Sequence, residues 1–151
     1  MTELRVFVSH ASKDAQDAEM LVHHLERQGV SCWISTRDIP NGKEFAEVLV
    51  EAIDGADLMV VLLTETANES QHVVREINRA VDRRKPILPV RIGNFELSKS
   101  MQYYLSHTQW LLIDEGAPLE ESLPDIEKAI KTPAKNSRSK DDVPRPIVVR
   151  R

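Results

Sequence analysis

The sequence predicts an α/β domain with a five-stranded parallel sheet and helices on both faces, and three observations lead to this fold class. Segments of strand character alternate with segments of helical periodicity five times along the chain. Residues 58–63 form an unbroken apolar run, which suits a strand that is covered on both faces. Glycines stand where two of the helical segments should end. Strict alternation favours parallel strands because right-handed crossovers leave few other connections.

The first strand is expected at residues 5–9, and a polar turn follows it, in which Asp14 is placed to cap a helix. That helix carries an apolar stripe at positions i, i+3, i+4 and i+7, and Gly29 marks its end. The stripe consists of Ala18, Leu21, Val22 and Leu25. A second strand is expected at residues 30–34, followed by a loop at residues 35–42 whose proline and Asn-Gly pair specify its shape.

A second amphipathic helix ends at Gly55, and its stripe consists of Phe45, Val48, Leu49, Ala52 and Ile53. The buried strand at residues 58–63 then leads into a polar loop at residues 64–70, which offers several N-caps. The helix after this loop repeats apolar residues at Val73, Ile77 and Ala80.

The next strand is expected at residues 87–90, after Pro86, where a proline removes no important ladder bond. A short helix, a strand at residues 108–113 and a last helix at about residues 119–130 complete the pattern. Five strands of this length indicate a flavodoxin-like arrangement, in which ligands bind outside the carboxyl ends of the strands. The loops at residues 9–14, 35–42 and 64–70 are all expected on that edge.

Length and charge divide the chain into a body and a tail. With 151 residues and 41% hydrophobic residues, one domain with a proper core is expected. Residues 1–130 carry 13 Lys and Arg against 22 Asp and Glu, a net charge of −9, whereas residues 131–151 carry 7 against 2, a net charge of +5. We therefore expect a domain at residues 1–130 and a basic, proline-containing linker or tail at residues 131–151, as in a chain that continues into a further domain.

Several classes of protein are disfavoured. Cys32 is the only cysteine, so an intrachain disulfide is impossible and a reducing cytoplasm is expected. The amino terminus lacks the apolar core of a signal peptide, and no apolar segment approaches the ~20 residues that span a membrane. The histidines include no metal-like pair, so no metal is predicted. The acidic body gives no reason to expect nucleic-acid binding.

Four segments, in this order and spacing, resemble the boxes of the Toll/interleukin-1 receptor (TIR) domain, especially its bacterial branch. Residues 6–10, Val-Phe-Val-Ser-His, resemble the first box, and residues 37–42, Arg-Asp-Ile-Pro-Asn-Gly, resemble the BB loop. Residues 70–76, Ser-Gln-His-Val-Val-Arg-Glu, are similar to the family's serine-to-glutamate helix segment, and residues 106–110, Ser-His-Thr-Gln-Trp, to its late strand. The resemblance covers about residues 5–130.

The resemblance implies an enzyme that cleaves NAD between nicotinamide and ribose, with NAD as substrate and no cofactor, in bacterial anti-phage defence. It assigns the catalytic role to Glu76. Substrate contacts would come from Ser9, His10, Arg37, Ile39, Ser70 and His72. Association with other TIR domains, in a homo-oligomer or a filament, would involve Asp38, Pro40, Asn41 and Gly42. His72 stands where several active members carry tryptophan.

A single carboxylate is chemically sufficient for this reaction. An ordinary glycosidase needs a second carboxyl group to protonate a departing alcohol, but nicotinamide leaves NAD as a neutral molecule. What remains is to stabilise the positive charge that grows on the ribose and to hold its hydroxyl groups, which one carboxylate can do.

Other interpretations stay open at this point. Without the resemblance, Glu76 is read as a solvated helix glutamate that pairs with a Lys or Arg one turn away, and Ser70 as an N-cap. A non-catalytic TIR–TIR adaptor would use the same surfaces for association only. A phosphoacceptor receiver would need acidic residues where Ser9, His10 and Thr64 stand.

Overall fold

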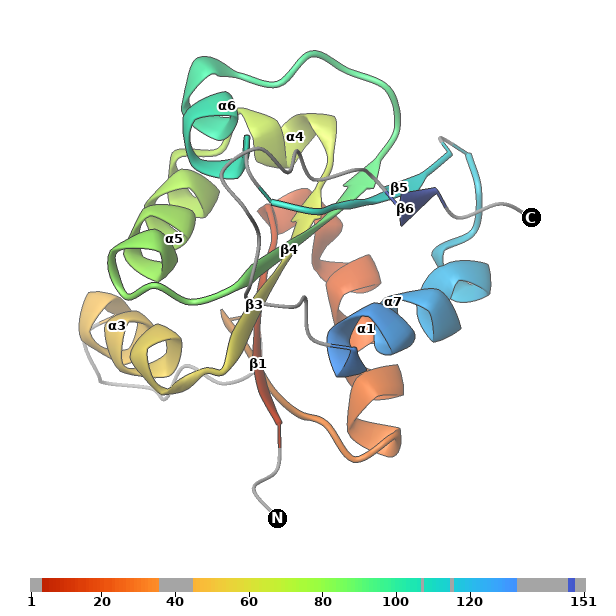
Figure 1. Ribbon diagram of the computed structural model, residues 1–151, viewed down its shortest axis with the longest axis horizontal. Coiled ribbons are helices and arrows are strands. Elements are labelled where there is room, and N and C mark those ends of the chain that lie inside the picture. The colour runs from red at the N-terminus through yellow and green to blue at the C-terminus, as the bar shows by residue number, and fades with distance from the viewer. Residues whose placement is uncertain (1–3, 36–44, 107, 115, 133–146, 149–151) are drawn as a thin grey trace.

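A wholly parallel sheet forms the centre of the computed structural model, which describes residues 4–35, 45–106, 108–114, 116–132 and 147–148. The strand order is β2-β1-β3-β4-β5-β6, and Figure 1 labels these strands except β2. The strands are β1 (Arg5–Ser9), β2 (Ser31–Ile34), β3 (Leu58–Leu63), β4 (Ile87–Ile92), β5 (Leu111–Ile113) and β6 (Ile147–Val148). The predicted five-stranded, flavodoxin-like parallel sheet is confirmed. A sixth strand, two residues long, comes from the tail and pairs with β5.

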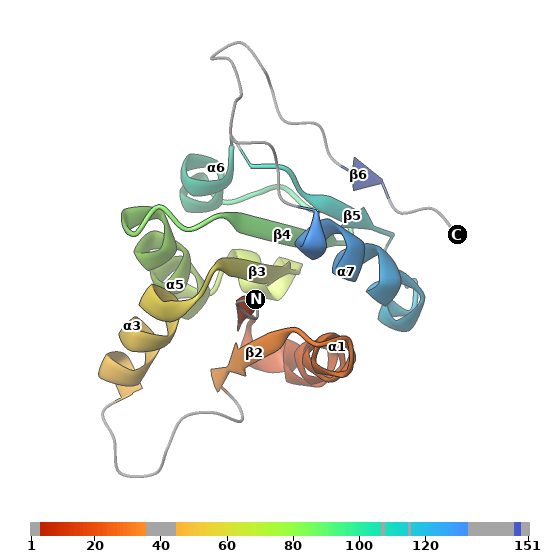
Figure 2. The ribbon, with the colours of Figure 1, turned by 60° about the horizontal axis from the view of Figure 1, so that its bottom comes forward.

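Helices cover both faces of this sheet, as predicted (Figure 2). One face packs against α1 (Ala15–Arg27) and α7 (Leu123–Lys131). The other face packs against α3 (Phe45–Gly55), α4 (Glu65–Asn68), α5 (Gln71–Asp82) and α6 (Lys99–Leu105). Two short 3-10 helices, η1 (Ser12–Asp14) and η2 (Leu119–Ser122), precede α1 and α7. Among the described residues, no helix has the length and apolar character needed to cross a membrane.

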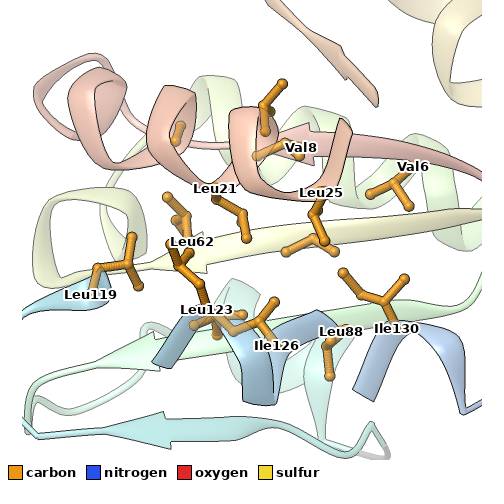
Figure 3. Close-up of a cluster of buried hydrophobic side chains, with 14 of the residues drawn as sticks. Val6, Val8, Leu21, Leu25, Leu62, Leu88, Leu119, Leu123, Ile126 and Ile130 are labelled. Atoms are coloured by element: carbon orange, nitrogen blue, oxygen red, sulfur yellow. The ribbon is translucent and has the colours of Figure 1, made fainter. Parts of the chain in front are cut away.

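Strand alternation divides the core into two clusters. Val60 and Leu62 of β3 belong to the cluster against α1 and α7, part of which is shown in Figure 3, whereas Met59, Val61 and Leu63 belong to the cluster on the other face. Both sets are almost fully buried. An unbroken apolar run is therefore what a strand at the centre of this sheet requires.

Besides shifts of one or two residues at the ends of β2 and β4, three differences from the prediction have a local cause. β5 begins at Leu111 rather than at residue 108, because the backbone and the hydroxyl group of Thr108 both donate to the carbonyl of Leu105 and prolong the end of α6. The last helix is split into η2 and α7, with Pro124 in the first turn of α7. The loop at residues 64–70 contains α4, whose N-cap Thr64 accepts a hydrogen bond from the backbone N–H of Ala67.

Asp14 does not cap α1 through its side chain, contrary to the prediction. Its carboxylate instead accepts a hydrogen bond of 2.6 Å from the hydroxyl group of Thr64, 50 residues further along the chain. The residue therefore connects the loop after β1 to the loop after β3. A tertiary partner has replaced the local cap.

Helices α1 and α5 end in the same way but with different residues at the left-handed position. Gly29 has φ of 86°, and Arg84 has φ of 56°. In each case the backbone N–H groups of this residue and of the next residue donate to carbonyls of the last helical turn, which is the Schellman pattern. A side chain in this backbone conformation is disfavoured by about 1 kcal/mol, so the two positions should respond in opposite directions.

We therefore expect Arg84→Gly to raise the free energy of unfolding by about 1 kcal/mol and Gly29→Ala to lower it by about the same amount. No atom lies within 4 Å of a Cβ built on Gly29, so the alanine should meet no clash and the effect should come from the backbone alone. Urea unfolding of both variants measures the two changes. If both variants changed the free energy of unfolding in the same direction, the assignment of a left-handed residue to both helix ends would be contradicted.

Candidate functional site

Glu76 lies on the buried face of α5. The helix begins at its N-cap Ser70, whose hydroxyl group accepts a hydrogen bond of 3.3 Å from the backbone N–H of Val73. Val73, Ile77 and Ala80 pack into the core, and Glu76 falls on the same stripe, with only 4% of its surface exposed. The interpretation of Glu76 as a solvated glutamate is therefore wrong. A buried carboxylate needs partners.

Both carboxylate oxygens of Glu76 have a close neighbour. The hydroxyl group of Ser9, the last residue of β1 and fully buried, donates a hydrogen bond of 2.6 Å to Oε1. On the other side, Nε2 of His72, one turn earlier on α5, lies 3.1 Å from Oε2, which is within ion-pair distance. The angles do not fit a hydrogen bond, so Oε2 is buried without a hydrogen-bond partner among the described residues. Neither partner is the Lys or Arg that a surface helix would supply. The carboxylate is thus held between the end of β1 and the exposed side of α5.

His72 is the polar group that faces outward. Its side chain is 40% exposed, against 5% for the side chain of Glu76. The Glu76 carboxylate beside the ring raises the pKa of His72 above its ordinary value, whereas burial and the nearby Arg75 act in the opposite direction. A larger share of the imidazole is therefore protonated near neutral pH than in a free histidine.

An open depression of about 680 Å³ lies between the loops that follow β1 and β3, and neither Glu76 nor His72 is among the residues that line it. Strand order reverses between these two strands, so the depression marks the switch point of the sheet. Ser70, the N-cap of α5, is one of the lining residues and links the depression to the helix that carries Glu76. The full lining consists of Ala11, Ser12, Lys13, Glu65, Thr66, Glu69 and Ser70.

The family model of the TIR domain matches residues 6–125, which is most of the chain. The chain belongs to the TIR domain family. Solved structures of low identity share its fold. The TIR domain of the Toll-related receptor TRR-2 from Hydra magnipapillata is 18% identical and gives a TM-score of 0.65, with 84% of this chain and 98% of that chain covered.

Two further structures share the fold of this TIR domain. The CMP N-glycosidase BcmB of Clostridium botulinum is 19% identical, with a TM-score of 0.58 and coverage of 82% of this chain and 98% of that chain. A TIR-STING receptor from C. gigas in complex with 2',3'-cGAMP is 21% identical, with a TM-score of 0.65 and coverage of 85% and 39%. No curated protein sequence matches this TIR domain significantly.

The residues predicted from the TIR boxes are only partly brought together. Ser9, His72 and Glu76 form one connected group, and Ser70 stands at the start of the same helix. Ser70 serves as an N-cap, which agrees with the alternative interpretation of this residue. The BB-loop residues lie outside the described residues; they are Arg37, Asp38, Ile39, Pro40, Asn41 and Gly42.

His10 is almost fully buried. Its Nδ1 lies 2.7 Å from the carbonyl oxygen of Ala11, so this nitrogen carries the proton and donates it. The other ring nitrogen, Nε2, is buried without a hydrogen-bond partner among the described residues. His10 therefore orders the loop after β1 through its Nδ1.

Two features of this TIR domain were missed by sequence reasoning. Lys13, Glu65 and Glu69 line the depression. The sequence indicated these residues only through their position in two loops that were expected at the carboxyl edge of the sheet. The hydrogen bond between Thr64 and Asp14 joins these loops and has no sequence signal. The basic run at residues 83–85 follows the carboxyl end of α5, where cationic side chains complement the helix dipole.

An ion pair connects α5 to α3, because Arg79 lies on α5 and Asp54 lies on α3. The guanidinium group of Arg79 donates two hydrogen bonds to the carboxylate of Asp54, of 3.0 and 2.7 Å, and these bonds lower the pKa of Asp54.

Within the described ranges, no three His, Cys, Asp or Glu side chains come close enough to share a metal ion. The connected polar groups of the candidate site are one carboxylate, one hydroxyl group and one imidazole, from Glu76, Ser9 and His72.

The His72–Glu76 pair predicts a pH dependence of stability. Because folding raises the pKa of His72, its contribution is fully present below the unfolded pKa of about 6.5 and is lost as pH rises through the folded pKa. We expect the stability difference between wild type and His72→Gln to shrink as pH is raised from about 5.5 to about 8.5. Urea unfolding across this range measures it, and a pH-independent difference would show that the pair does not form.

Proposed function

We propose that this TIR domain is an NAD⁺ nucleosidase of bacterial anti-phage defence, which acts in the cytoplasm and is activated by self-association. The observation that carries the proposal is the buried Glu76 carboxylate, oriented by the hydroxyl group of Ser9 beside the switch point of the sheet. Ligands of this fold class bind at that edge. The carboxylate is the group that the family resemblance assigns to catalysis.

In the proposed reaction the bond between nicotinamide and C1' of the ribose breaks, and nicotinamide leaves with the bonding electrons as a neutral molecule. Glu76 stabilises the positive charge that develops on the ribose. Water attacks C1' and releases its proton, which gives ADP-ribose. Attack by the adenine of the same molecule would give cyclic ADP-ribose instead.

The other groups of the site would bind the substrate. Lys13 is the cationic side chain among the residues that line the depression, and it would contact the diphosphate. Glu65 and Glu69 line the same depression and restrict where a diphosphate is accommodated. We assign substrate contacts to Ser9, His10, Ser70 and His72, with Arg37 and Ile39 from the BB loop.

Self-association completes the proposal. Asp38, Pro40, Asn41 and Gly42 would contact a neighbouring TIR domain in a homo-oligomer or filament. We expect the dispersed domain to be weakly active. The test incubates the protein with NAD, at low concentration and at high concentration with a crowding agent, and follows nicotinamide release by wild type and Glu76→Gln. Equal release from both proteins would overturn the role of Glu76.

One observation favours a second candidate, a non-catalytic TIR–TIR adaptor. Glu76 already accepts a hydrogen bond from Ser9 at Oε1 and has the His72 ring within ion-pair distance of Oε2, and a buried carboxylate held in this way can be purely structural. The adaptor predicts intact NAD after prolonged incubation of a sample that sedimentation shows to be assembled. Nicotinamide release by the same sample would exclude it.

A further inference from the structure

We propose that His72 and Glu76 form an acid–base pair that extends the substrates of this site to nucleoside monophosphates, whose base takes up a proton as it leaves. The inference rests on the proposed function, since it uses the same carboxylate. It goes further because it assigns a chemical step to His72. The geometry behind it is the 3.1 Å contact between Nε2 of His72 and Oε2 of Glu76.

The two classes of substrate differ in what they require of the enzyme. Nicotinamide in NAD carries a positive charge and leaves as a neutral molecule without any proton. A cytosine or adenine base in a nucleotide is neutral, and without a proton it would leave as an anion. An acid that protonates the departing base is therefore needed for nucleotides and not for NAD.

His72 meets the requirements for that acid. Its side chain is 40% exposed on the outer side of the buried carboxylate, so a bound base can reach the ring. Two charged groups act on it: Glu76 raises the pKa of His72, with the larger effect, and Arg75 lowers it. The imidazolium form is thus favoured while Glu76 stays ionised. A tryptophan at this position has no proton of comparable acidity to give.

His72 and Glu76 together carry out every proton transfer of the catalytic cycle, so that both regain their starting protonation states. The imidazolium of His72 gives a proton to the base as the bond from the base to C1' breaks. Glu76 stabilises the positive ribose and then accepts a proton from the water that attacks C1'. That proton passes back to the imidazole across the 3.1 Å contact. The net reaction is hydrolysis of the nucleotide to ribose 5-phosphate and free base.

Chromatography of released base and nicotinamide tests the inference, with CMP, AMP and NAD as separate substrates of the assembled full chain. We expect wild type to release base from both nucleotides. In His72→Gln and His72→Trp, base release should fall about 100-fold or more, and the ratio of base release to nicotinamide release should fall at least about 10-fold. Base release should also decline as pH rises through the raised pKa of His72, and nicotinamide release should lack this decline.

The chain offers a matched control in His24, whose Nε2 lies 2.9 Å from a carboxylate oxygen of Glu127 between α1 and α7. His24→Gln removes an equivalent pair away from the depression and should leave all three rates unchanged. NAD cleavage without nucleotide cleavage, or base release that His72→Gln does not reduce selectively, would overturn the inference alone. An assembled protein that cleaves none of the three would overturn the proposed function as well.

Discussion

Glu76→Gln is expected to lower the rate of nicotinamide release from NAD at least about 100-fold, the size of effect seen when a group that stabilises transition-state charge is removed. Glutamine has nearly the same shape, and its carbonyl oxygen can accept the hydrogen bond that Ser9 donates to Oε1. The site should keep its geometry and lose its negative charge. Rates at saturating NAD, measured on assembled protein, report this loss.

The control for this variant is Glu127→Gln. Glu127 also has a histidine partner, His24, but it lies on α7, on the opposite face of the sheet from α5. We expect full activity from it. Circular dichroism of both variants should match that of wild type, which separates loss of charge from loss of fold. An unchanged rate in folded, assembled Glu76→Gln would remove this residue from the mechanism.

Leu62→Ala is expected to lower the free energy of unfolding by about 3 kcal/mol, within the range of about 2 to 5 kcal/mol for truncation of a buried leucine. Leu62 is fully buried in β3, in the cluster that α1 and α7 cover (Figure 3). The parallel sheet is closed on both sides of this strand, so the site has little freedom to collapse around the cavity. Urea unfolding measures the change.

Val50→Ala provides the comparison, because Val50 is 37% exposed on α3. Its truncation should change the free energy of unfolding by less than about 0.5 kcal/mol. Similar losses at Val50 and Leu62 would contradict the placement of β3 at the centre of the sheet.

The periodicities of the sequence were sufficient to predict the fold. The apolar run of β3 indicated a strand covered on both faces, and the i, i+3, i+4, i+7 stripe of α1 indicated a helix packed on a sheet. The burial of Glu76 could have been predicted from the same helical periodicity. Val73, Glu76, Ile77 and Ala80 have this spacing, so the carboxylate falls on the apolar stripe and not beside it.

The contacts of the site could not be predicted in this way. Ser9 and Glu76 are 67 residues apart in the sequence. They meet only because β1 lies next to β3 in the sheet and α5 packs on the face opposite α1 and α7. The cap expected from Asp14 was lost for the same reason, since Thr64 came within reach after folding. The strand β6 has two residues, too few for any periodicity to indicate it.

The hydrogen bond between Thr64 and Asp14 has a consequence for how a ligand would enter the depression. Thr64 also caps α4, so a single hydroxyl group fastens the two loops that flank the switch point. A molecule that binds there finds these loops already aligned and loses little entropy in ordering them. The association rate at this edge should therefore be set by diffusion and charge, with no slow rearrangement of these two loops beforehand.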